Sequence, residues 1–308
     1  MRQCGAGLVR RRNSAGHSHL AVWRGYLPAV NELSAHKTPV MSDPILSIRH
    51  LSFGYHSDQP VLQDVNFALQ PGRIAVILGA NGAGKTTLLA LLLGWLTAWS
   101  GEIALQGTPL RQFSARERGH RMALVPQSEH TPFDYTVLEY VLMGRAPHLP
   151  PLGMPTAVDI EIAHHALEQV GIGVLARRPV PQLSGGERQL MLLARALAQI
   201  SPTNGQLPDN APRLLLLDEP TAHLDLHNKA RLIDIMRRLR DMGVTLLMTN
   251  HEPDVALAVA DDALLMAAGA APQFGPVGQV LTADALSRLY QLPIRLIEVD
   301  GRKRVLWT

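Results

Sequence analysis

Residues 78 to 87, LGANGAGKTT, place small residues directly before a lysine and two threonines. The spacing G-x-x-x-x-G-K-T that begins at Gly79 matches a phosphate-binding loop, with a strand expected before it and a helix after it. Small residues let backbone N–H groups point at a phosphate, and the helix beginning near Gly84 adds the positive end of its dipole. We expect Lys85 to face solvent and neutralise the β- and γ-phosphates, and the Thr86 hydroxyl to bind Mg²⁺. The predicted phosphate site consists of Gly79, Ala80, Asn81, Gly82, Ala83, Gly84, Lys85, Thr86 and Thr87.

Two acidic residues follow a second buried strand pattern. The run RLLLLDEP, residues 213 to 220, reads as a central strand that ends in Asp218 and Glu219. Ligands bind at the carboxyl ends of the strands in open α/β sheets. We therefore expect Asp218 to hold Mg²⁺ and Glu219 to orient and deprotonate the attacking water.

A second anion site is predicted at the start of a long helix. In QLSGGERQLMLLARALAQI, residues 182 to 200, Ser184, Gly185 and Gly186 precede the helical pattern and leave its N-terminal N–H groups free of side chains. One phosphate loop already holds a nucleotide. A second anion site is therefore best explained if it reaches the γ-phosphate of a nucleotide held by another copy of the chain.

The residues LSGGE, Leu183 to Glu187, resemble the signature of the ATP-binding cassette (ABC) family, and the resemblance covers roughly residues 45 to 292. It implies an α/β P-loop NTPase cassette with a mixed central sheet, an N-terminal antiparallel β region and an inserted helical subdomain. It also implies ATP and Mg²⁺ as cofactors. Two copies would sandwich ATP, with each signature (Ser184, Gly185, Gly186 and Glu187) facing the partner's nucleotide.

The resemblance assigns expectations to further residues. Tyr55 matches the aromatic residue that stacks on adenine. Gln127 matches the glutamine that senses Mg²⁺ and the attacking water, and His251 matches the switch histidine that contacts the γ-phosphate. Asp225 matches the loop that crosses to the partner cassette. His223 departs from the family pattern, because a small residue is commoner at that position.

Strand patterns alternate with helical ones from Ile45 onward. Strands separated by helices of this length predict a parallel sheet covered on both faces. We expect strands at 45–51, 61–69, 73–79, 101–107, 122–127, 213–219 and 244–250, and helices at 85–94, 187–200, 226–243, 253–260 and over most of 136–170.

These elements suggest a cassette domain over residues 43–292, with a helical subdomain at about 128–182. The Pro-, Asn- and Gly-rich segment 201–213 is expected to be an exposed loop. Residues 293–308 place strand patterns on both sides of an Asp-Gly pair, which predicts a β-hairpin tail. Residues 1–40 are Arg-rich, poor in acids and without a continuous apolar segment. We expect a disordered leader or a misassigned start there, with a transit peptide as the alternative.

Composition narrows the class of function. The formal charge is +3 and several basic residues precede position 40, so no broad basic face is predicted and nucleic acid is not an expected partner. Cys4 is the only cysteine, which excludes an internal disulfide framework. The longest apolar run, Leu88 to Trp99, is interrupted by Gly94 and is shorter than the roughly 20 residues needed to cross a bilayer.

The stretches 137–149 and 281–299 resemble ATPases of importers for iron chelates, haem, cobalamin and, in some relatives, molybdate. The expected protein is an ATPase that energises such an importer. Its expected partners are a second cassette, transmembrane permease subunits that dock near residues 128–148 and, indirectly, a periplasmic substrate-binding protein. The expected location is peripheral, on the cytoplasmic face of the inner membrane. The alternatives are an ATPase of a zinc or manganese importer, an exporter ATPase, and a non-transport cassette protein of translation or DNA repair.

Overall fold

The computed structural model describes residues 43–129, 133–203, 211–267 and 271–307. All of them belong to one compact unit, Lys37–Thr308. The predicted leader and the middle of the predicted loop 201–213 lie outside the described residues.

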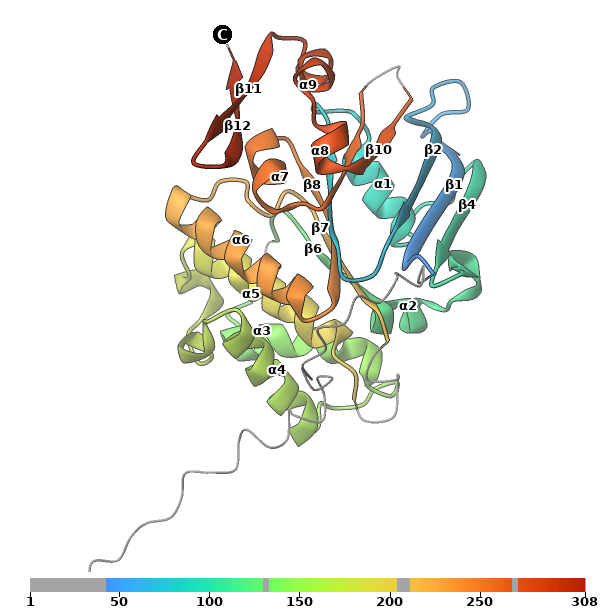
Figure 1. Cartoon of the computed structure of the whole chain (residues 1–308). Helices are drawn as coiled ribbons and strands as arrows, with labels where there is room; N and C mark the ends of the chain where they lie inside the picture. The colour runs from blue at the N-terminus through green and yellow to red at the C-terminus, as the bar shows by residue number, and fades with distance from the viewer. Residues whose placement is uncertain (1–42, 130–132, 204–210, 268–270, 308) are drawn as a thin grey trace, which may run out of the picture. The chain divides into compact units, whose positions relative to one another are not determined.

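A six-stranded sheet forms the centre of this unit, in the order β10-β9-β3-β8-β7-β6 (Figure 1). Its strands are β3 (Ile74–Leu78), β6 (Met122–Val125), β7 (Arg213–Leu217), β8 (Val244–Asn250), β9 (Asp262–Leu265) and β10 (Gln273–Pro276). Neighbours from β9 to β6 run parallel, whereas β10 runs antiparallel to β9. Every residue of β3 and β8 is buried, as expected for strands covered on both faces.

The sequence patterns predicted neither β9 nor β10. Both strands are only four residues long, and β10 (QFGP) contains a glycine and a proline, which are rare in strand interiors. As the outermost strand, β10 tolerates these residues because only one of its edges is paired. The central sheet is therefore mixed.

Alternate residues of the same strands enter two different hydrophobic clusters. Ala75 and Ile77 pack with helix α1 (Lys85–Leu92), whereas Val76 and Leu78 belong to the cluster that contains helix α5 (Gly185–Ile200). Successive side chains of a strand point to opposite faces. Helices α1 and α5 therefore cover opposite faces of the sheet.

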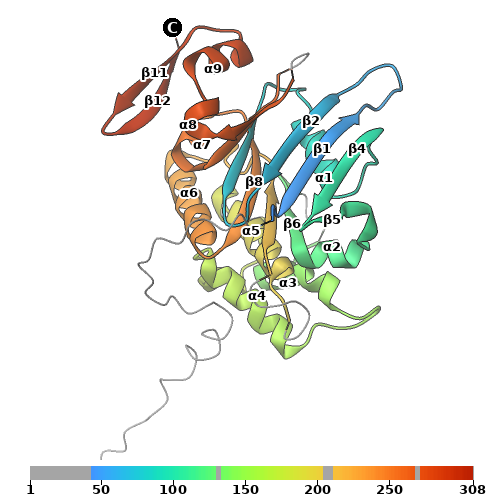
Figure 2. The ribbon, with the colours of Figure 1, turned by 45° about the vertical axis from the view of Figure 1, so that its right-hand side comes forward.

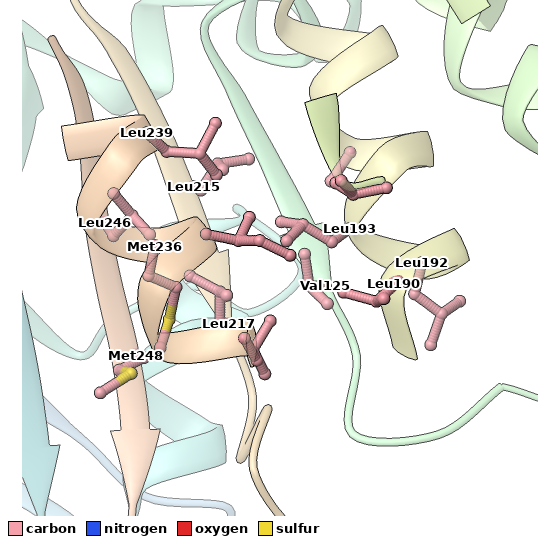
Figure 3. Close-up of a cluster of buried hydrophobic side chains, with 14 of the residues drawn as sticks. Val125, Leu190, Leu192, Leu193, Leu215, Leu217, Met236, Leu239, Leu246 and Met248 are labelled. Atoms are coloured by element: carbon pink, nitrogen blue, oxygen red, sulfur yellow. The ribbon is translucent and has the colours of Figure 1, made fainter. Parts of the chain in front are cut away.

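The face that carries α5 is also covered by helix α6 (Leu226–Asp241). Figure 3 shows Leu190 and Leu193 of α5 and Met236 and Leu239 of α6 directed at side chains from the strands. Most of these residues are fully buried, and the strand residues drawn with them are Val125, Leu215, Leu217, Leu246 and Met248. The resulting apolar layer fixes the start of α5 relative to the sheet.

A second, antiparallel sheet has the order β2-β1-β4-β5 and lies beside the central sheet (Figure 2). Its strands are β1 (Leu46–Phe53), β2 (Leu62–Leu69), β4 (Ser100–Leu105) and β5 (Thr108–Pro109), and helix α2 (Ala115–Arg121) follows. Leu46 and Val65 of this sheet share a cluster with Ile77 of the central sheet and Leu88 of α1. Helix α1 is therefore enclosed between the two sheets, as Figure 2 also shows.

The region 136–170, predicted to be mostly helical, contains a break. Helix α3 (Val137–Leu142) continues as a 3₁₀ turn to His148, and helix α4 (Ala157–Gln169) begins only after Thr156. The intervening sequence LPPLGMP contains three prolines and a glycine, which do not sustain a helix. Thr136 and Thr156 each cap the next helix through a capping box, and both helices pack against α5.

Arg145 joins this helical region to the end of α5. Its side chain is fully buried and donates to the Asp159 carboxylate at 3.0 Å and to the backbone carbonyls of Ala198 and Ser201. Burial lowers the pKa of the Arg145 guanidinium. The buried Arg145–Asp159 ion pair is tolerated because several acceptors bond to the guanidinium.

We expect Arg145→Met to lower the free energy of unfolding by about 3 to 5 kcal/mol, because Asp159 loses its buried partner. Chemical denaturation measures this loss. Adding Asp159→Asn, which removes the orphaned charge, should restore part of it. An unchanged midpoint in the single variant would contradict the prediction.

The C-terminal part contains helices α7 (Pro253–Val259), α8 (Val277–Val280) and α9 (Ala283–Tyr290) and a two-stranded hairpin, β11 (Ile294–Val299) with β12 (Arg302–Trp307). Strand β12 packs against α7 and β11 against α9 (Figure 1). Within the described ranges, no helix combines the length and the apolar character required to span a bilayer.

Candidate nucleotide-binding site

The glycine loop lies between the carboxyl end of β3 and the start of α1. Gly84 precedes α1 with a left-handed backbone (φ 88°) and, as a glycine, offers the helix no side-chain cap. A Cβ at Gly84 would lie 2.8 Å from Leu62, and one at Gly79 would lie 2.5 Å from the carbonyl oxygen of Met266. Glycine is therefore required at both positions, and the first amides of α1 are available to an anion.

Lys85 is buried, with 6% of its surface exposed, rather than facing solvent as predicted. Its Nζ donates to the carbonyl oxygens of Gly79 (2.8 Å) and Ala80 (3.2 Å), and it lies 3.7 Å from Oε1 of Glu219. Burial is explained by these contacts, because a buried ammonium group needs acceptors. The cation is held across the loop where phosphates are expected.

Thr86 and Asp218 lie close together at the adjacent strand ends. The Thr86 hydroxyl donates to the Asp218 carboxylate at 3.4 Å, and the Thr249 hydroxyl donates to its other oxygen at 2.6 Å. A hydroxyl and a carboxylate are hard oxygen ligands of the kind Mg²⁺ prefers, together with substrate phosphates. The predicted Mg²⁺ ligands Thr86 and Asp218 therefore fit the ion.

Glu219 is the centre of a polar cluster. Gln127 donates to its Oε2 at 3.3 Å, and Nδ1 of His251 lies 3.4 Å from the same oxygen. The backbone of Glu219 is left-handed (φ 42°), a conformation that costs a non-glycine residue about 1 to 3 kcal/mol. Its amide donates to the Thr249 hydroxyl at 2.9 Å, which helps to hold this conformation. The structure thus brings together Lys85, Gln127, Glu219 and His251.

Tyr55 borders a pocket of about 350 Å³ beside the glycine loop. The tyrosine is 61% exposed, and its hydroxyl lies 3.2 Å from that of Thr87. Phe53 contacts the Tyr55 ring edge to face, with the centroids 5.2 Å apart. The remaining lining includes Gly82 and Ala83 of the loop, so a base in this pocket would adjoin phosphates at α1.

The signature residues form the first turn of α5. Contrary to the prediction, this turn is not free of side chains, because Ser184 and Glu187 form a capping box. The Ser184 hydroxyl accepts from the Glu187 amide at 3.3 Å, and the Glu187 carboxylate accepts from the Ser184 amide at 2.8 Å. Hydrogen bonding of the Glu187 carboxylate by the Ser184 amide and, next, by the Ser184 hydroxyl lowers the pKa of Glu187. Among the described residues, nothing lies within 4 Å of a Cβ added at Gly185, so the turn is open on that side.

Asp225 lies beside the signature and not in the Glu219 cluster. It caps α6 by accepting from the Asn228 amide at 2.7 Å, and a Cβ added at Gly186 would lie 2.5 Å from Cγ of Asn228. His223, the departure from the family pattern, has a left-handed backbone (φ 61°). Glycine adopts this conformation most readily, and histidine is among the non-glycine residues that adopt it more often than most.

Thr249 was missed by the sequence analysis. It is fully buried and bonds to both Asp218 and the backbone of Glu219, so it sets the geometry of both acids. The stretch VTLLMTN reads as an ordinary buried strand, in which threonine is common. The available signal was its place at the carboxyl end of a parallel strand, two residues before His251.

Comparison with known proteins identifies the family of the chain. The profile of the family described as "ABC transporter" matches residues 62–222. The chain belongs to the ABC transporter family. Within that family it is an ATP-hydrolysing subunit.

Among its relatives is the hemin import ATP-binding protein HmuV of Burkholderia thailandensis, 38% identical over 82% of this chain and 96% of that protein. HmuV of Burkholderia pseudomallei is 39% identical over 78% of this chain and 92% of that protein. A solved metal-chelate type ABC transporter, in an inward-facing conformation, is 33% identical with a TM-score of 0.73 and covers 86% of this chain and 97% of its own. The ADP form of the ATP-binding cassette MJ1267 shares the fold, with 24% identity and a TM-score of 0.68. The match covers 80% of this chain and 98% of that cassette.

Proposed function

We propose that the chain energises the import of haem or a related iron chelate through a membrane permease. The observation that carries this proposal is the similarity to hemin import ATP-binding proteins along nearly their whole length. The similarity to a metal-chelate type transporter supports the same substrate class.

Two copies of the chain would form the working ATPase. The phosphate loop begins α1 and the signature begins α5, and these helices cover opposite faces of the central sheet. This arrangement supports a site composed of one copy's phosphate loop and the other copy's signature. A two-fold axis would then produce two equivalent sites.

In each site, Glu219 would accept a proton from the attacking water while Gln127 and His251 fix the direction of its carboxylate. Lys85 would leave the carbonyls of Gly79 and Ala80 and bind the phosphates. Mg²⁺, held by Thr86, Gln127 and Asp218 with the nucleotide, would neutralise charge that develops on the phosphates. Tyr55 would stack on the adenine.

The remaining assignments extend the proposal to partners and location. Permease subunits would dock near residues 128–148, and a periplasmic binding protein would deliver the chelate to the permease. The ATPase would lie on the cytoplasmic face of the inner membrane as a peripheral subunit. The domain limits 43–292, with a helical subdomain at about 128–182 and a hairpin tail at 293–308, form part of this proposal.

Growth on haemin as the only iron source tests the substrate class. We expect deletion of the coding sequence to abolish this growth, and the intact sequence to restore it. Growth on ferrous salts should be unchanged and serves as the control. Normal growth on haemin after deletion, with loss of growth on a ferric siderophore or of cobalamin uptake, would contradict haem and identify the other chelate.

A further inference from the structure

Residues 250–254, hereafter the switch loop, run from the last residue of β8 into the first turn of α7 and contain His251. Two of its side chains, those of Asn250 and Glu252, bond to residues of the preceding 221–229 segment. Asn250 donates to the Thr221 hydroxyl at 2.9 Å, and Lys229 of α6 bonds to both carboxylate oxygens of Glu252 at 2.7 and 2.8 Å. None of these bonds involves the peptide carbonyl of His251 itself.

That carbonyl is bonded from the C-terminal part of the chain. Tyr290, the last residue of α9, donates its hydroxyl to the carbonyl oxygen of His251 at 2.8 Å. Burial raises the pKa of the Tyr290 hydroxyl, so it stays protonated and able to donate. Gln291 ends α9 with a left-handed backbone (φ 56°), which places the tyrosine at the tip of the helix.

A second contact reaches the same loop from the terminal hairpin. The carboxylate of Asp254 accepts from the amide of Val305 in β12 at 3.0 Å. Val305 and Ile294 of the hairpin are buried, and both belong to the large core cluster. The hairpin and α9 are therefore part of the packed domain and can restrain the loop.

The direction of the His251 ring depends on its backbone. The side chain is 48% exposed, and its ring nitrogen lies 3.4 Å from the Glu219 carboxylate. A half-exposed ring receives little restraint from packing, so the orientation of the adjacent peptide determines where it points. A misplacement of about 1 Å can cost a catalytic site up to two orders of magnitude.

From these contacts we infer that Tyr290 is a positioning residue for His251, and that α9 with the terminal hairpin braces the switch loop for ATP hydrolysis. The inference rests on the proposed role of His251 in hydrolysis. Tyr290 touches no reacting atom. It acts by fixing the peptide that follows His251.

The test compares Tyr290→Phe, which removes only the hydroxyl, with Arg288→Ala. Arg288 also lies in the last turn of α9, but its side chain is exposed and it takes no part in the contacts to the switch loop or to the hairpin described above. Steady-state hydrolysis by the purified full chain with Mg²⁺ should show a kcat about three- to tenfold lower in Tyr290→Phe, with KM for ATP nearly unchanged. Arg288→Ala should keep the kcat of the unmodified chain.

A double-variant cycle separates positioning from general destabilisation. In the presence of His251→Ala, adding Tyr290→Phe should lower kcat no further, because the residue that it positions is gone. Hydrogen exchange of the amides of residues 250–252 and 254 should become faster in Tyr290→Phe and stay unchanged in Arg288→Ala.

An unchanged kcat and unchanged exchange in Tyr290→Phe, with a low kcat in His251→Ala, would overturn this inference alone. Equal losses in both backgrounds of the cycle would also overturn it, because they indicate a structural role. A normal kcat in His251→Ala would instead overturn the proposed role of the histidine.

Discussion

Glu219→Gln is expected to lower ATP hydrolysis by roughly 10²- to 10⁴-fold, which is the usual range for loss of a general base. The amide keeps the shape of the carboxylate and its reach to Gln127 and His251 but cannot accept the proton of the attacking water. ATP binding should persist, because the phosphate loop is unchanged. Phosphate release and nucleotide titration measure the two properties separately.

The same variant tests the paired arrangement. Without hydrolysis, Glu219→Gln with Mg²⁺ and ATP should elute as a dimer in size-exclusion chromatography with light scattering. Adding Ser184→Arg should return the protein to monomer, because Ser184 begins the exposed first turn of α5. A variant that binds ATP and stays monomeric at high micromolar concentration would contradict autonomous pairing.

The other large effect is expected for Lys85→Met, which should abolish measurable hydrolysis and weaken ATP binding by about ten- to hundredfold. Loss of a charge-assisted bond to an anion explains this magnitude. Methionine retains the apolar stem of the buried side chain, so the domain should remain folded. Isothermal titration calorimetry measures the affinity.

A matched control for this variant is Lys303→Met, because Lys303 lies in the exposed part of β12. This control should hydrolyse ATP like the unmodified chain. If Lys85→Met also hydrolysed ATP at the normal rate, Lys85 would not be the phosphate-binding cation.

The fold was predictable where a local pattern carries the information. The leucine run of β7 and the glycine loop before α1 follow from hydrophobicity and spacing, and both lie where the sequence predicts them. Strands β9 and β10 were not predictable, because four-residue strands with glycine and proline depend on their neighbours.

For the site, the identities of the residues were predictable from the sequence, but several of their contacts were not. Spacing identifies Lys85 and Glu219, but the burial of Lys85 depends on carbonyls that only the folded loop presents. The capping box at Ser184 has a sequence pattern, and its geometry could have been expected. The bond from Tyr290 to the backbone of His251 joins residues 39 positions apart, a pairing that no local pattern encodes.

The separation of α1 and α5 by the central sheet has a consequence for the energetics of nucleotide binding. In the proposed pair, each rigid sheet connects half of one site to half of the other, so neither site can close without bringing the second closer to closure. Pairing the two copies costs entropy, and the binding free energy of the first ATP offsets most of this cost. The second ATP then binds to halves that are already aligned, which is positive cooperativity between identical sites.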